Sequence, residues 1–336
     1  MAEHVDVAEL HRRAPVADGH ADSLLWNRDL NRASNAGHVD FPRLKEAGVK
    51  LQCFTVVTRG LPVIDGFQAF ARLRGWPASA RAGEWSRCTW QVDRLAHFCR
   101  QSEGLASIAG TAGHLTANLA QGRLSAIIGI EGGHALEGDP SRVAELMTRG
   151  VRFMSLSHLS NNELGGTSTP LFGNKPLTPL GARVLEAMEG AGMLLDLAHA
   201  SPAMLPRLLS FKGRVFCSHA GISGAHAMWR NLTDETLRAV ANRGGVVGVI
   251  FAPQFLGGRQ VGDLVRHVRH ALDVMGEDGV AFGSDFDGFI PLPQGLRDVR
   301  DLPKVTQALV DAGLPVRVVE KVIGGNFRRF FGEALG

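Results

Sequence analysis

The stretch Pro15-Val16-Ala17-Asp18-Gly19-His20-Ala21-Asp22 places two metal-binding side chains at the end of a short apolar run. The run predicts a buried β-strand over residues 16–20 that leads into a turn. Because side chains alternate along an extended chain, His20 and Asp22 are expected on one face, where both could bind a single cation. Imidazole and carboxylate groups are common ligands of divalent metals. This stretch therefore predicts one part of a metal site at a strand end.

Seven further short apolar runs follow along the chain, and amphipathic stretches of helical period separate most of them. The eight predicted strands cover residues 16–20, 49–58, 125–131, 152–158, 193–199, 214–219, 245–251 and 280–285. Helices are expected at residues 141–149, 179–190, 203–209, 233–243 and 263–275, with caps that include Ser201 and Thr233. Short strands rich in Val, Ile, Leu and Phe are typical of a parallel sheet that is buried on both faces. Eight such strands alternating with helices predict an α/β fold, the (β/α)8 TIM barrel of metal-dependent hydrolases.

One interval, at about residues 59–124, is too long for a simple connection after the second strand. Residues 90–121 predict one or two helices with a short apolar piece at 105–109. Barrel strands lie on both sides of the interval, so we interpret it as an inserted helical and loop segment that could extend over the barrel mouth. Residues 1–336 are accordingly expected to form a single barrel domain.

Composition excludes several other classes of protein. The 336 residues are 45% hydrophobic and 21% charged, as in a globular domain, and the formal charge of +3 is too small to indicate binding to nucleic acid or an anionic membrane. The first 22 residues lack an apolar core of signal-peptide length, and no run approaches the roughly 20 apolar residues of a membrane span. We therefore expect a cytoplasmic protein whose four cysteines are buried free thiols. The composition leaves the oligomeric state open, a homodimer included.

Three more strand ends carry metal-binding side chains. Glu131 follows Ile127-Ile128-Gly129-Ile130, His199 ends the run at 193–199, and His219 ends the run at 214–219. In a barrel of this type the carboxyl ends of all strands meet on one face, where the active site lies. His20 and Asp22 could then bind one metal and His199 and His219 a second, with the two oxygens of Glu131 bridging them. Two ions about 3.5–4 Å apart could share a hydroxide whose pKa both charges lower.

Three other positions suit a hydrolytic reaction at such a site. His158 ends the fourth predicted strand and could donate a hydrogen bond to a developing oxyanion. Arg230 lies just past the sixth strand, and its planar guanidinium suits a substrate carboxylate, although a structural ion pair is an equal alternative. Asp285, at the end of the last strand, is placed to transfer a proton. Asp287 points the same way by the period of two and is an alternative for that role.

Each of these residues taken alone has an ordinary explanation. A histidine at a strand end is more often a hydrogen-bonded structural residue than a ligand, and an acid after an apolar run can mark a strand that leaves the core. The joint pattern of five such residues at successive strand ends favours a metal site. Most other histidines are interpreted as surface or local structure, and His134 and His226 are the two whose positions come nearest to the predicted site.

Several motifs together resemble the membrane (renal-type) dipeptidase family of zinc metallopeptidases. They are residues 16–22, Ile130-Glu-Gly-Gly-His134, Leu195-Asp-Leu-Ala-His-Ala-Ser201, Ser218-His219 with Arg230-Asn231, and Gly283-Ser-Asp-Phe-Asp-Gly288, and the resemblance extends in order from about residue 15 to Phe331. It implies an amidohydrolase-type barrel with two Zn²⁺ per chain and hydrolysis of dipeptides, including those with a D-residue at the carboxyl end. It further implies that His20 and Asp22 bind one zinc, His199 and His219 the other, and that Glu131 bridges.

The resemblance also implies roles for the remaining site residues, and three functional hypotheses follow. His158 would stabilise the tetrahedral intermediate, Arg230 would bind the substrate carboxylate, and Asp285 would shuttle the proton. The first hypothesis is a zinc-dependent dipeptidase. The second is an N-acyl amino acid or lactam amidohydrolase on the same binuclear site, which would not need a free substrate amine. The third is a barrel that binds a small ligand without turnover.

Overall fold

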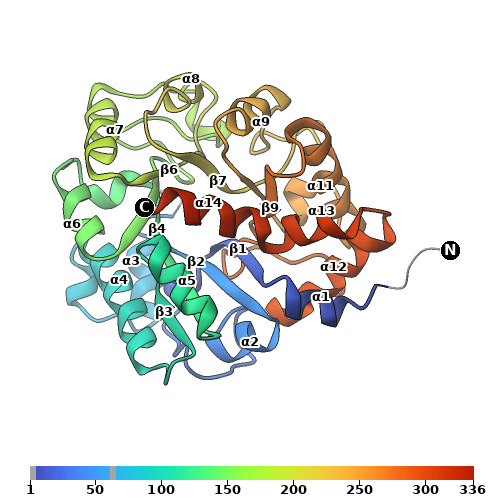
Figure 1. The fold of residues 1–336 in the computed structure, drawn as a ribbon. Coiled ribbons are helices and arrows are strands. Elements are labelled where there is room, and N and C mark those ends of the chain that lie inside the picture. Colours follow the sequence, from blue (N-terminus) through green and yellow to red (C-terminus); the bar gives the residue numbers. More distant parts are fainter. Residues whose placement is uncertain (1–4, 61–65) are drawn as a thin grey trace.

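Eight parallel strands form a closed barrel at the centre of the protein, with helices around it (Figure 1). The computed structural model describes residues 5–60 and 66–336. Pairing of β2 with β4 over Leu51–Val57 and Ser125–Glu131 closes the ring, so the barrel order is β1-β2-β4-β5-β6-β7-β8-β9. The barrel strands are β1 (Val16–Ala21), β2 (Val49–Val57), β4 (Leu124–Glu131), β5 (Val151–Ser155), β6 (Leu194–Asp196), β7 (Val215–Ala220), β8 (Val247–Val249) and β9 (Val280–Phe282). The predicted fold class is confirmed.

Three strands end three residues earlier than the sequence predicts. β5 ends at Ser155, β6 at Asp196 and β9 at Phe282, so His158, His199 and Asp285 each lie in a loop three residues beyond the strand. The backbone leaves the extended conformation in two of these loops, with φ of 63° at His199 and 62° at Asp285. The apolar runs continue past the hydrogen-bonded ladder because the loop residues are themselves buried above the barrel.

Helices follow most of the barrel strands and pack their apolar faces against the barrel. The five helices predicted from the sequence correspond to α6 (Arg142–Thr148), α7 (Pro179–Ala191), α8 (Leu205–Leu208), α9 (Asp234–Ala241) and α11 (Val261–Met275). The remaining ones outside the inserted segment are α1 (Val7–Arg13), α2 (Phe41–Glu46), α10 (Pro253–Leu256), α12 (Leu302–Asp311), α13 (Val316–Glu320) and α14 (Asn326–Ala334). Thr233 caps α9 as predicted, by accepting from the Thr236 amide. The predicted cap at Ser201 is wrong, because its hydroxyl donates to the Lys175 carbonyl and α8 begins at Leu205.

The described residues of the long interval between β2 and β4 form three α-helices and one extra strand. These elements are α3 (Gly66–Leu73), α4 (Glu84–Gln101), β3 (Ala106–Ile108) and α5 (Ala112–Ala120). β3 corresponds to the apolar piece expected at 105–109. It pairs with the first residues of β4, along the same edge of β4 that pairs with β5 from Ile128 onward. β3 therefore lies outside the closed ring, and α4 packs Cys88, Val92 and Leu95 into the main core.

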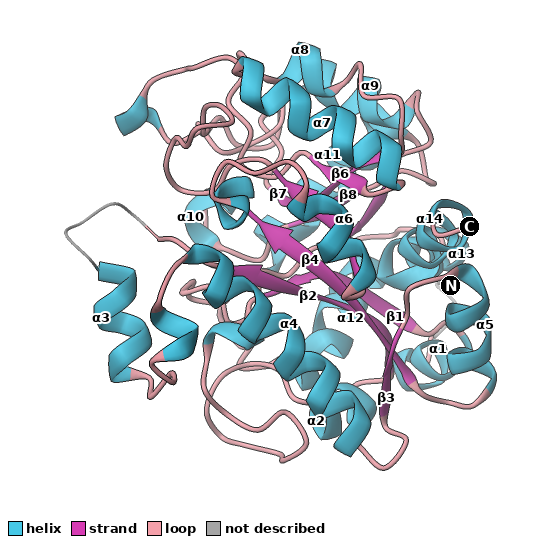
Figure 2. Cartoon of the chain, turned by 90° about the vertical axis from the view of Figure 1, so that its left-hand side faces the viewer, coloured by secondary structure: helices cyan, strands magenta, loops and turns pink. Residues whose placement is uncertain are grey.

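The two ends of the barrel are covered differently. α14 crosses the amino-terminal end, where Phe327, Phe330 and Phe331 pack on Phe216 and other side chains inside the barrel (Figure 1). Gly19 of β1 allows this approach, because a Cβ there would come within 2.6 Å of the Phe327 ring. α3 lies at the opposite end, beside the carboxyl ends of the strands (Figure 2). The charged and aromatic side chains at that second end form the candidate site.

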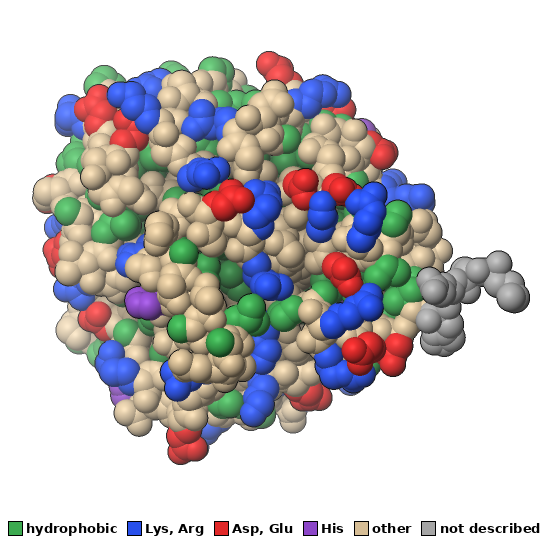
Figure 3. Space-filling view, in the orientation of Figure 1, with side chains coloured by type: hydrophobic (Ala, Val, Ile, Leu, Met, Phe, Trp, Pro, Cys, Tyr) green, Lys and Arg blue, Asp and Glu red, His purple; other side chains and the backbone are tan. Residues whose placement is uncertain are grey.

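The surface and the cysteines agree with a globular barrel. Lys and Arg side chains alternate with Asp and Glu on the face around α14 (Figure 3). No helix among the described residues is long and apolar enough to cross a membrane. The four cysteines are free, and all except the partly buried Cys99 are buried, as expected.

Candidate metal centre

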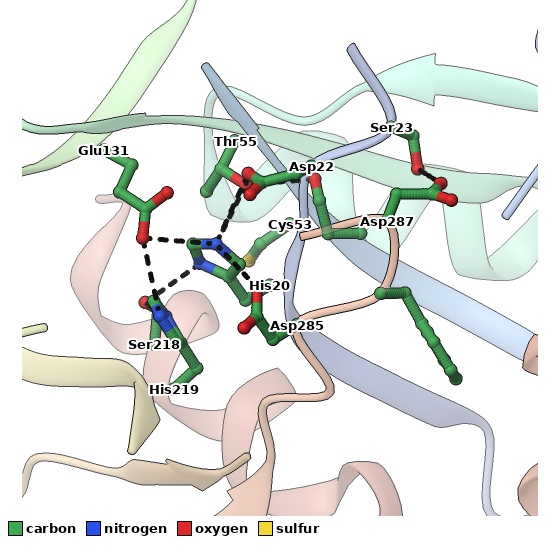
Figure 4. A network of polar contacts seen from close by, with 12 residues as sticks. His20, Asp22, Ser23, Cys53, Thr55, Glu131, Ser218, His219, Asp285 and Asp287 are labelled. Carbon is green, nitrogen blue, oxygen red and sulfur yellow. Dashed lines mark hydrogen bonds and ion pairs between the residues drawn. The ribbon is translucent and has the colours of Figure 1, made fainter. Parts of the chain in front are cut away.

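Six side chains converge on Glu131 or on one another above the carboxyl ends of the strands. Figure 4 shows His20, Asp22, His219 and Asp285 of this group together with Glu131. Glu131, the last residue of β4, lies at the centre of the group and is 3% exposed. Its Oε1 lies 2.8 Å from Nε2 of His199, 3.4 Å from Nε2 of His219 and 3.6 Å from Nε2 of His20. The other oxygen, Oε2, lies 3.4 Å from Nε2 of His158. The strand ends therefore bring together residues separated by more than 190 positions in the sequence, as the barrel predicts.

Two carboxylates from neighbouring strands complete the group on the side of His20. Oδ1 of Asp22 lies 3.5 Å from Nε2 of His20, and Oδ1 of Asp285 lies 3.9 Å from the same nitrogen. Asp22 follows β1 directly and Asp285 follows β9, and these two strands are neighbours in the barrel. The proximity of His20 and Asp22 that the sequence predicts is thus present, although Asp22 lies in a turn rather than in the strand itself.

The donor set fits divalent metal ions. Ligand atoms lie within 4.8 Å of one another in three buried groups, which are His20 with Glu131 and His219, Glu131 with His158 and His199, and His20 with Asp22 and Asp285. Nε2 of His199 and Nε2 of His219 lie 3.2 Å apart and both point toward Glu131. Among the described residues, Oε2 of Glu131 has no hydrogen-bond partner. A buried carboxylate without a donor is costly unless a cation neutralises it, so the chemistry of this group suits a metal.

Hydroxyl groups orient the imidazoles and one carboxylate. Ser218 Oγ lies 3.2 Å from Nδ1 of His20 and 2.9 Å from Nδ1 of His219, so a single hydroxyl contacts both rings on the side away from Glu131. Thr55 Oγ1 lies 2.6 Å from Oδ1 of Asp22. Such contacts set the tautomer and the direction of a ligand side chain. The sequence analysis did not identify Ser218 or Thr55, and a polar residue inside an otherwise apolar strand was the available signal.

A buried carboxylate below the site was also missed. Asp18 is fully buried in β1 and accepts from the amide and hydroxyl of Ser284 and from Nε2 of Gln52, each at 2.7 Å. Burial raises the pKa of Asp18 to about 6, against the lowering effect of these hydrogen bonds. Because Ser284 precedes Asp285, this network connects the base of β1 to the loop that carries Asp285.

Electrostatics divide the site into neutral and charged groups. Burial, together with the charge of Arg230, lowers the pKa of His199 well below its usual range. Burial and the charge of His20 do the same for the pKa of His219. The pKa of Glu131 is also well below its usual value, because the surrounding histidines, led by His158 and His20, outweigh the opposing effect of burial. Neutral His199 and His219 beside an ionised Glu131 are in the protonation states in which these side chains bind metal. The pKa of His20 is instead raised well above its usual range, because Glu131 and Asp22 outweigh the opposing effect of burial.

His158 and Arg230 lie at the edge of the group. Nδ1 of His158 lies 3.1 Å from the carbonyl oxygen of Arg59, and because a carbonyl only accepts, this nitrogen carries the proton. Nη2 of Arg230 donates to the His219 carbonyl at 2.8 Å, and the side chain is 3% exposed. No carboxylate among the described residues pairs with Arg230, so the structural ion pair that was the alternative interpretation is absent there.

The structure separates Asp285 from Asp287. Residues 285 and 287 both have positive φ, 62° and 66°, so the segment is not extended and the period of two does not apply. Asp287 is in none of the groups of converging ligand atoms around Glu131 and His20, which are called the metal-binding group below. It accepts instead from Ser23 Oγ at 2.5 Å and from the His38 amide at 2.7 Å. It also pairs with Arg28. The sequence-based expectation that Asp287 points the same way as Asp285 is wrong.

The two histidines nearest to the site in the sequence differ in position. His134 is buried, its Nδ1 lies 3.3 Å from Nδ2 of Asn162, and burial followed by the charge of His158 lowers its pKa to about 3. His226 lies against Gly257, and its carbonyl accepts from Asn231. Neither belongs to the groups of converging ligand atoms among the described residues. The interpretation of both as local structure agrees with these contacts.

A cavity of about 410 Å³ opens above the metal-binding group. Glu131, His158, His199 and Arg230 lie on its floor and one side, and Leu25, Val57, Phe67, Phe70, Ile250, Phe255 and Phe289 are among its apolar walls. A volume of this order holds a small ligand rather than a polymer. A barrel with buried imidazoles and carboxylates at the carboxyl ends of its strands, below a cavity of this kind, defines a metal-dependent hydrolase.

Comparison with known proteins gives the family. The sequence profile of the membrane dipeptidase family, peptidase family M19, matches residues 5–335, so the chain belongs to this family and is a peptide-bond hydrolase that uses a metal cofactor. A dipeptidase of Aspergillus oryzae is 28% identical over 96% of this chain and 78% of its own length. A metallopeptidase of Rhodobacter sphaeroides, solved with a phosphinate mimic of the dipeptide L-Ala-D-Ala, is 25% identical, with a TM-score of 0.81 over 94% of this chain and 98% of that one. A dipeptidase described as an M19 metallopeptidase is 25% identical, with a TM-score of 0.82 over 96% and 99% of the two chains.

Proposed function

We propose that this chain is a zinc-dependent dipeptidase that hydrolyses dipeptides, including those with a D-residue at the carboxyl end. The observation that carries the proposal is the sharing of Glu131 by two groups of imidazoles beneath a cavity that also contains the buried guanidinium of Arg230. The relative from Rhodobacter sphaeroides, which was solved with a mimic of L-Ala-D-Ala, supports the choice of substrate.

The ligands would divide between two zinc ions. His20 and Asp22 would hold one ion, His199 and His219 the other, and Glu131 would contact both. When bound, two such ions polarise a carbonyl and lower the pKa of a water molecule, which supplies the nucleophile for hydrolysis. Ser218 holds the rings of His20 and His219 by their Nδ1 atoms and leaves both Nε2 atoms directed at the centre. Thr55 holds the carboxylate of Asp22 by a hydrogen bond from its hydroxyl to Oδ1.

Three other side chains would act on the substrate directly. Arg230 would bind the terminal carboxylate, because its guanidinium is buried beside the cavity and its neighbouring protein partner is a carbonyl. His158 would donate from Nε2 to the oxygen of the scissile carbonyl, and since Nδ1 already donates to Arg59, this requires the doubly protonated ring.

Asp285 would pass a proton to the leaving amine. Burial is the main cause that raises the pKa of Asp285 well above its usual range, and the charges of Asp22 and Glu131 add to it, while His20 opposes them. A carboxyl group with a raised pKa keeps its proton to a higher pH than an ordinary carboxyl group does, as a general acid requires.

A screen of metal-loaded enzyme against L,L and L,D dipeptides tests the proposal. We expect hydrolysis of Gly-D-Ala and much slower hydrolysis of N-acetyl-Gly-D-Ala. Equal rates on the two would instead favour the N-acyl amino acid or lactam amidohydrolase, which requires the same Arg230 contact but no free amine. Tight binding of two zinc ions with no turnover of any dipeptide would favour the third hypothesis, a ligand-binding barrel.

A further inference from the structure

An aromatic wall, formed by Phe67, Phe70 and Phe289, borders the active-site cavity. The ring centroids of Phe67 and Phe70 are 5.8 Å apart, and those of Phe70 and Phe289 are 5.4 Å apart. Both distances lie in the range of edge-to-face and tilted aromatic contacts. Phe67 and Phe70 come from α3 and Phe289 from the loop after β9, so two separate segments build one apolar surface.

Phe289 has features of a residue kept for contact with a ligand. Its side chain is 63% exposed although it is large and apolar, and its backbone φ of 61° is unfavourable for an aromatic residue. The Trp26 ring lies 4.9 Å from the Phe289 ring, and its indole Nε1 donates to the Asp287 carbonyl at 2.8 Å. Arg74 covers the Trp26 ring at 4.3 Å. The Phe289 ring is therefore held in position by Trp26, and it lines both the active-site cavity and the hollow beside Trp26 and Arg74.

The barrel order places the α3 part of the aromatic wall, Phe67 and Phe70, across the site from Arg230, whereas Phe289 follows β9, two strands from β7. Arg230 follows β7, whereas α3 follows β2, and these two strands are four positions apart in a ring of eight. The inference rests on the proposed dipeptidase function. A dipeptide whose carboxylate is bound by Arg230 and whose peptide bond lies at the metal-binding group extends its amino-terminal residue toward α3 and Phe289.

The cavity lining offers no partner for a charged side chain at that end. Apart from the converging ligand groups and Arg230, the described residues that line the cavity are apolar or uncharged. A Lys side chain placed there would lose hydration without gaining an ion pair, and it would lie near Arg74 and Arg87, whose guanidinium groups lie against the Phe70 and Phe67 rings. A ring or a branched aliphatic group would gain contacts with aromatic faces.

We propose that the aromatic wall is a specificity subsite that binds a large apolar or aromatic side chain on the amino-terminal residue of the dipeptide. A large apolar group in such a pocket changes kcat/KM by roughly 10–200-fold relative to a small one. We therefore expect Phe-Gly and Leu-Gly to be cleaved at least about tenfold more efficiently than Ala-Gly, and Lys-Gly to be a poor substrate.

The decisive experiment compares variants of the wall on matched substrates. Phe289→Ala should lower kcat/KM for Phe-Gly by about tenfold and leave Ala-Gly within about twofold, whereas Phe289→Leu should retain most of the preference. Phe70→Ala should behave like Phe289→Ala. Leu119→Ala provides the control, because Leu119 is a partly exposed apolar residue of α5 at the amino-terminal end of the barrel. It should leave both substrates unchanged.

Three results would overturn the subsite. They are equal kcat/KM for Phe-Gly and Ala-Gly in wild type, an equal loss on both substrates in Phe289→Ala, and a preference that follows the carboxyl-terminal residue in the series Gly-Phe and Gly-Ala. Failure of the proposed function has a different signature, the absence of turnover of any dipeptide by metal-loaded protein. In that case calorimetric binding of Phe-Gly and Ala-Gly to wild type and Phe289→Ala measures the subsite directly, and equal affinities would refute it.

Discussion

Ser23 Oγ donates a 2.5 Å hydrogen bond to Oδ2 of Asp287, which joins the turn after β1 to the loop after β9. Asp22 immediately precedes Ser23, and Asp285 lies two residues before Asp287. The hydrogen bond therefore fixes the spacing between the two segments that carry the carboxylates nearest to His20. It also shows that two acids separated by one residue have different functions, because one faces the metal-binding group and the other holds the loops together.

The Asp285→Asn and Asp287→Asn variants should separate these functions. Asp285→Asn should keep its metals and its thermal stability but lose roughly 10²–10⁴-fold in kcat, the usual contribution of a general acid or base. Asp287→Asn should lose about 3 kcal/mol of folding free energy, because Arg28 is left without its buried partner. Measurements of kcat and Tm on both variants give the comparison.

Asp93→Asn is a suitable control, since Asp93 forms a surface pair with Arg149 and should contribute less than about 1 kcal/mol. The opposite result would assign the proton transfer to Asp287. In that case Asp287→Asn would lose its kcat at an unchanged Tm, and Asp285→Asn would keep its kcat.

Metal content should depend on Glu131 more than on any single histidine. Purified wild-type protein should contain about two zinc equivalents per chain, because Glu131 is shared by two of the three groups of converging ligand atoms. Glu131→Gln should lower occupancy of both positions, whereas His20→Ala should mainly empty one. Mass spectrometry of bound metal after dialysis measures the stoichiometry, and at most one equivalent in zinc-reconstituted wild type would rule out a binuclear site.

Arg230 should determine the requirement for a free carboxylate. Removing a buried, charge-assisted partner costs about 2–5 kcal/mol, so Arg230→Ala should lower kcat/KM for dipeptides by roughly 30-fold or more. Arg230→Lys should recover only part of the activity, because an ammonium group cannot reproduce the planar fork.

A dipeptide amide provides the test on the substrate side. It should be a poor substrate for wild type and should lose little more in Arg230→Ala, because the charge that Arg230 recognises is already absent. If wild type cleaves the amide and the free acid equally well, Arg230 has a structural role and the enzyme is a broader amidase.

His267 should make the fold sensitive to acid. Nδ1 accepts from the Ile222 amide at 2.9 Å, Nε2 lies 3.2 Å from the Leu256 carbonyl, and burial lowers the pKa to about 4. In the unfolded chain His267 takes up a proton near pH 6.5, whereas in the folded protein its pKa is about 4. The contribution of His267 to the free energy of unfolding is therefore present above pH 6.5 and is lost as the pH falls toward 4.

Urea unfolding at several pH values would reveal this contribution. The free energy of unfolding of His267→Gln should fall less between pH 6.5 and 4 than that of wild type. His97→Gln, at an exposed position in α4, should follow the wild-type curve. Parallel curves for wild type and His267→Gln would show that His267 does not contribute to the acid sensitivity.

Much of the fold and of the site could be predicted from the sequence, because buried parallel strands and their ends have local signatures. Continuous apolar runs located the eight barrel strands, and His20, Glu131 and His219 are in strands that run to the predicted ends or one residue beyond. An acid or histidine at the end of such a run stands out against the apolar residues before it. The selection of these candidate metal-binding residues therefore needed only the order of residues along the chain.

Contacts between loops could not be predicted in the same way. His199 and Asp285 lie in loops with positive φ, and their approach to the rest of the site depends on backbone turns that have no reliable local pattern. The same turns direct Asp287 to Ser23 and Arg28, against the period of two. The aromatic wall joins residues 70 and 289, which become neighbours only because the barrel closes β1 between β2 and β9. Strand composition thus determined which residues could bind metal, and closure of the barrel decided which side chains surround the substrate.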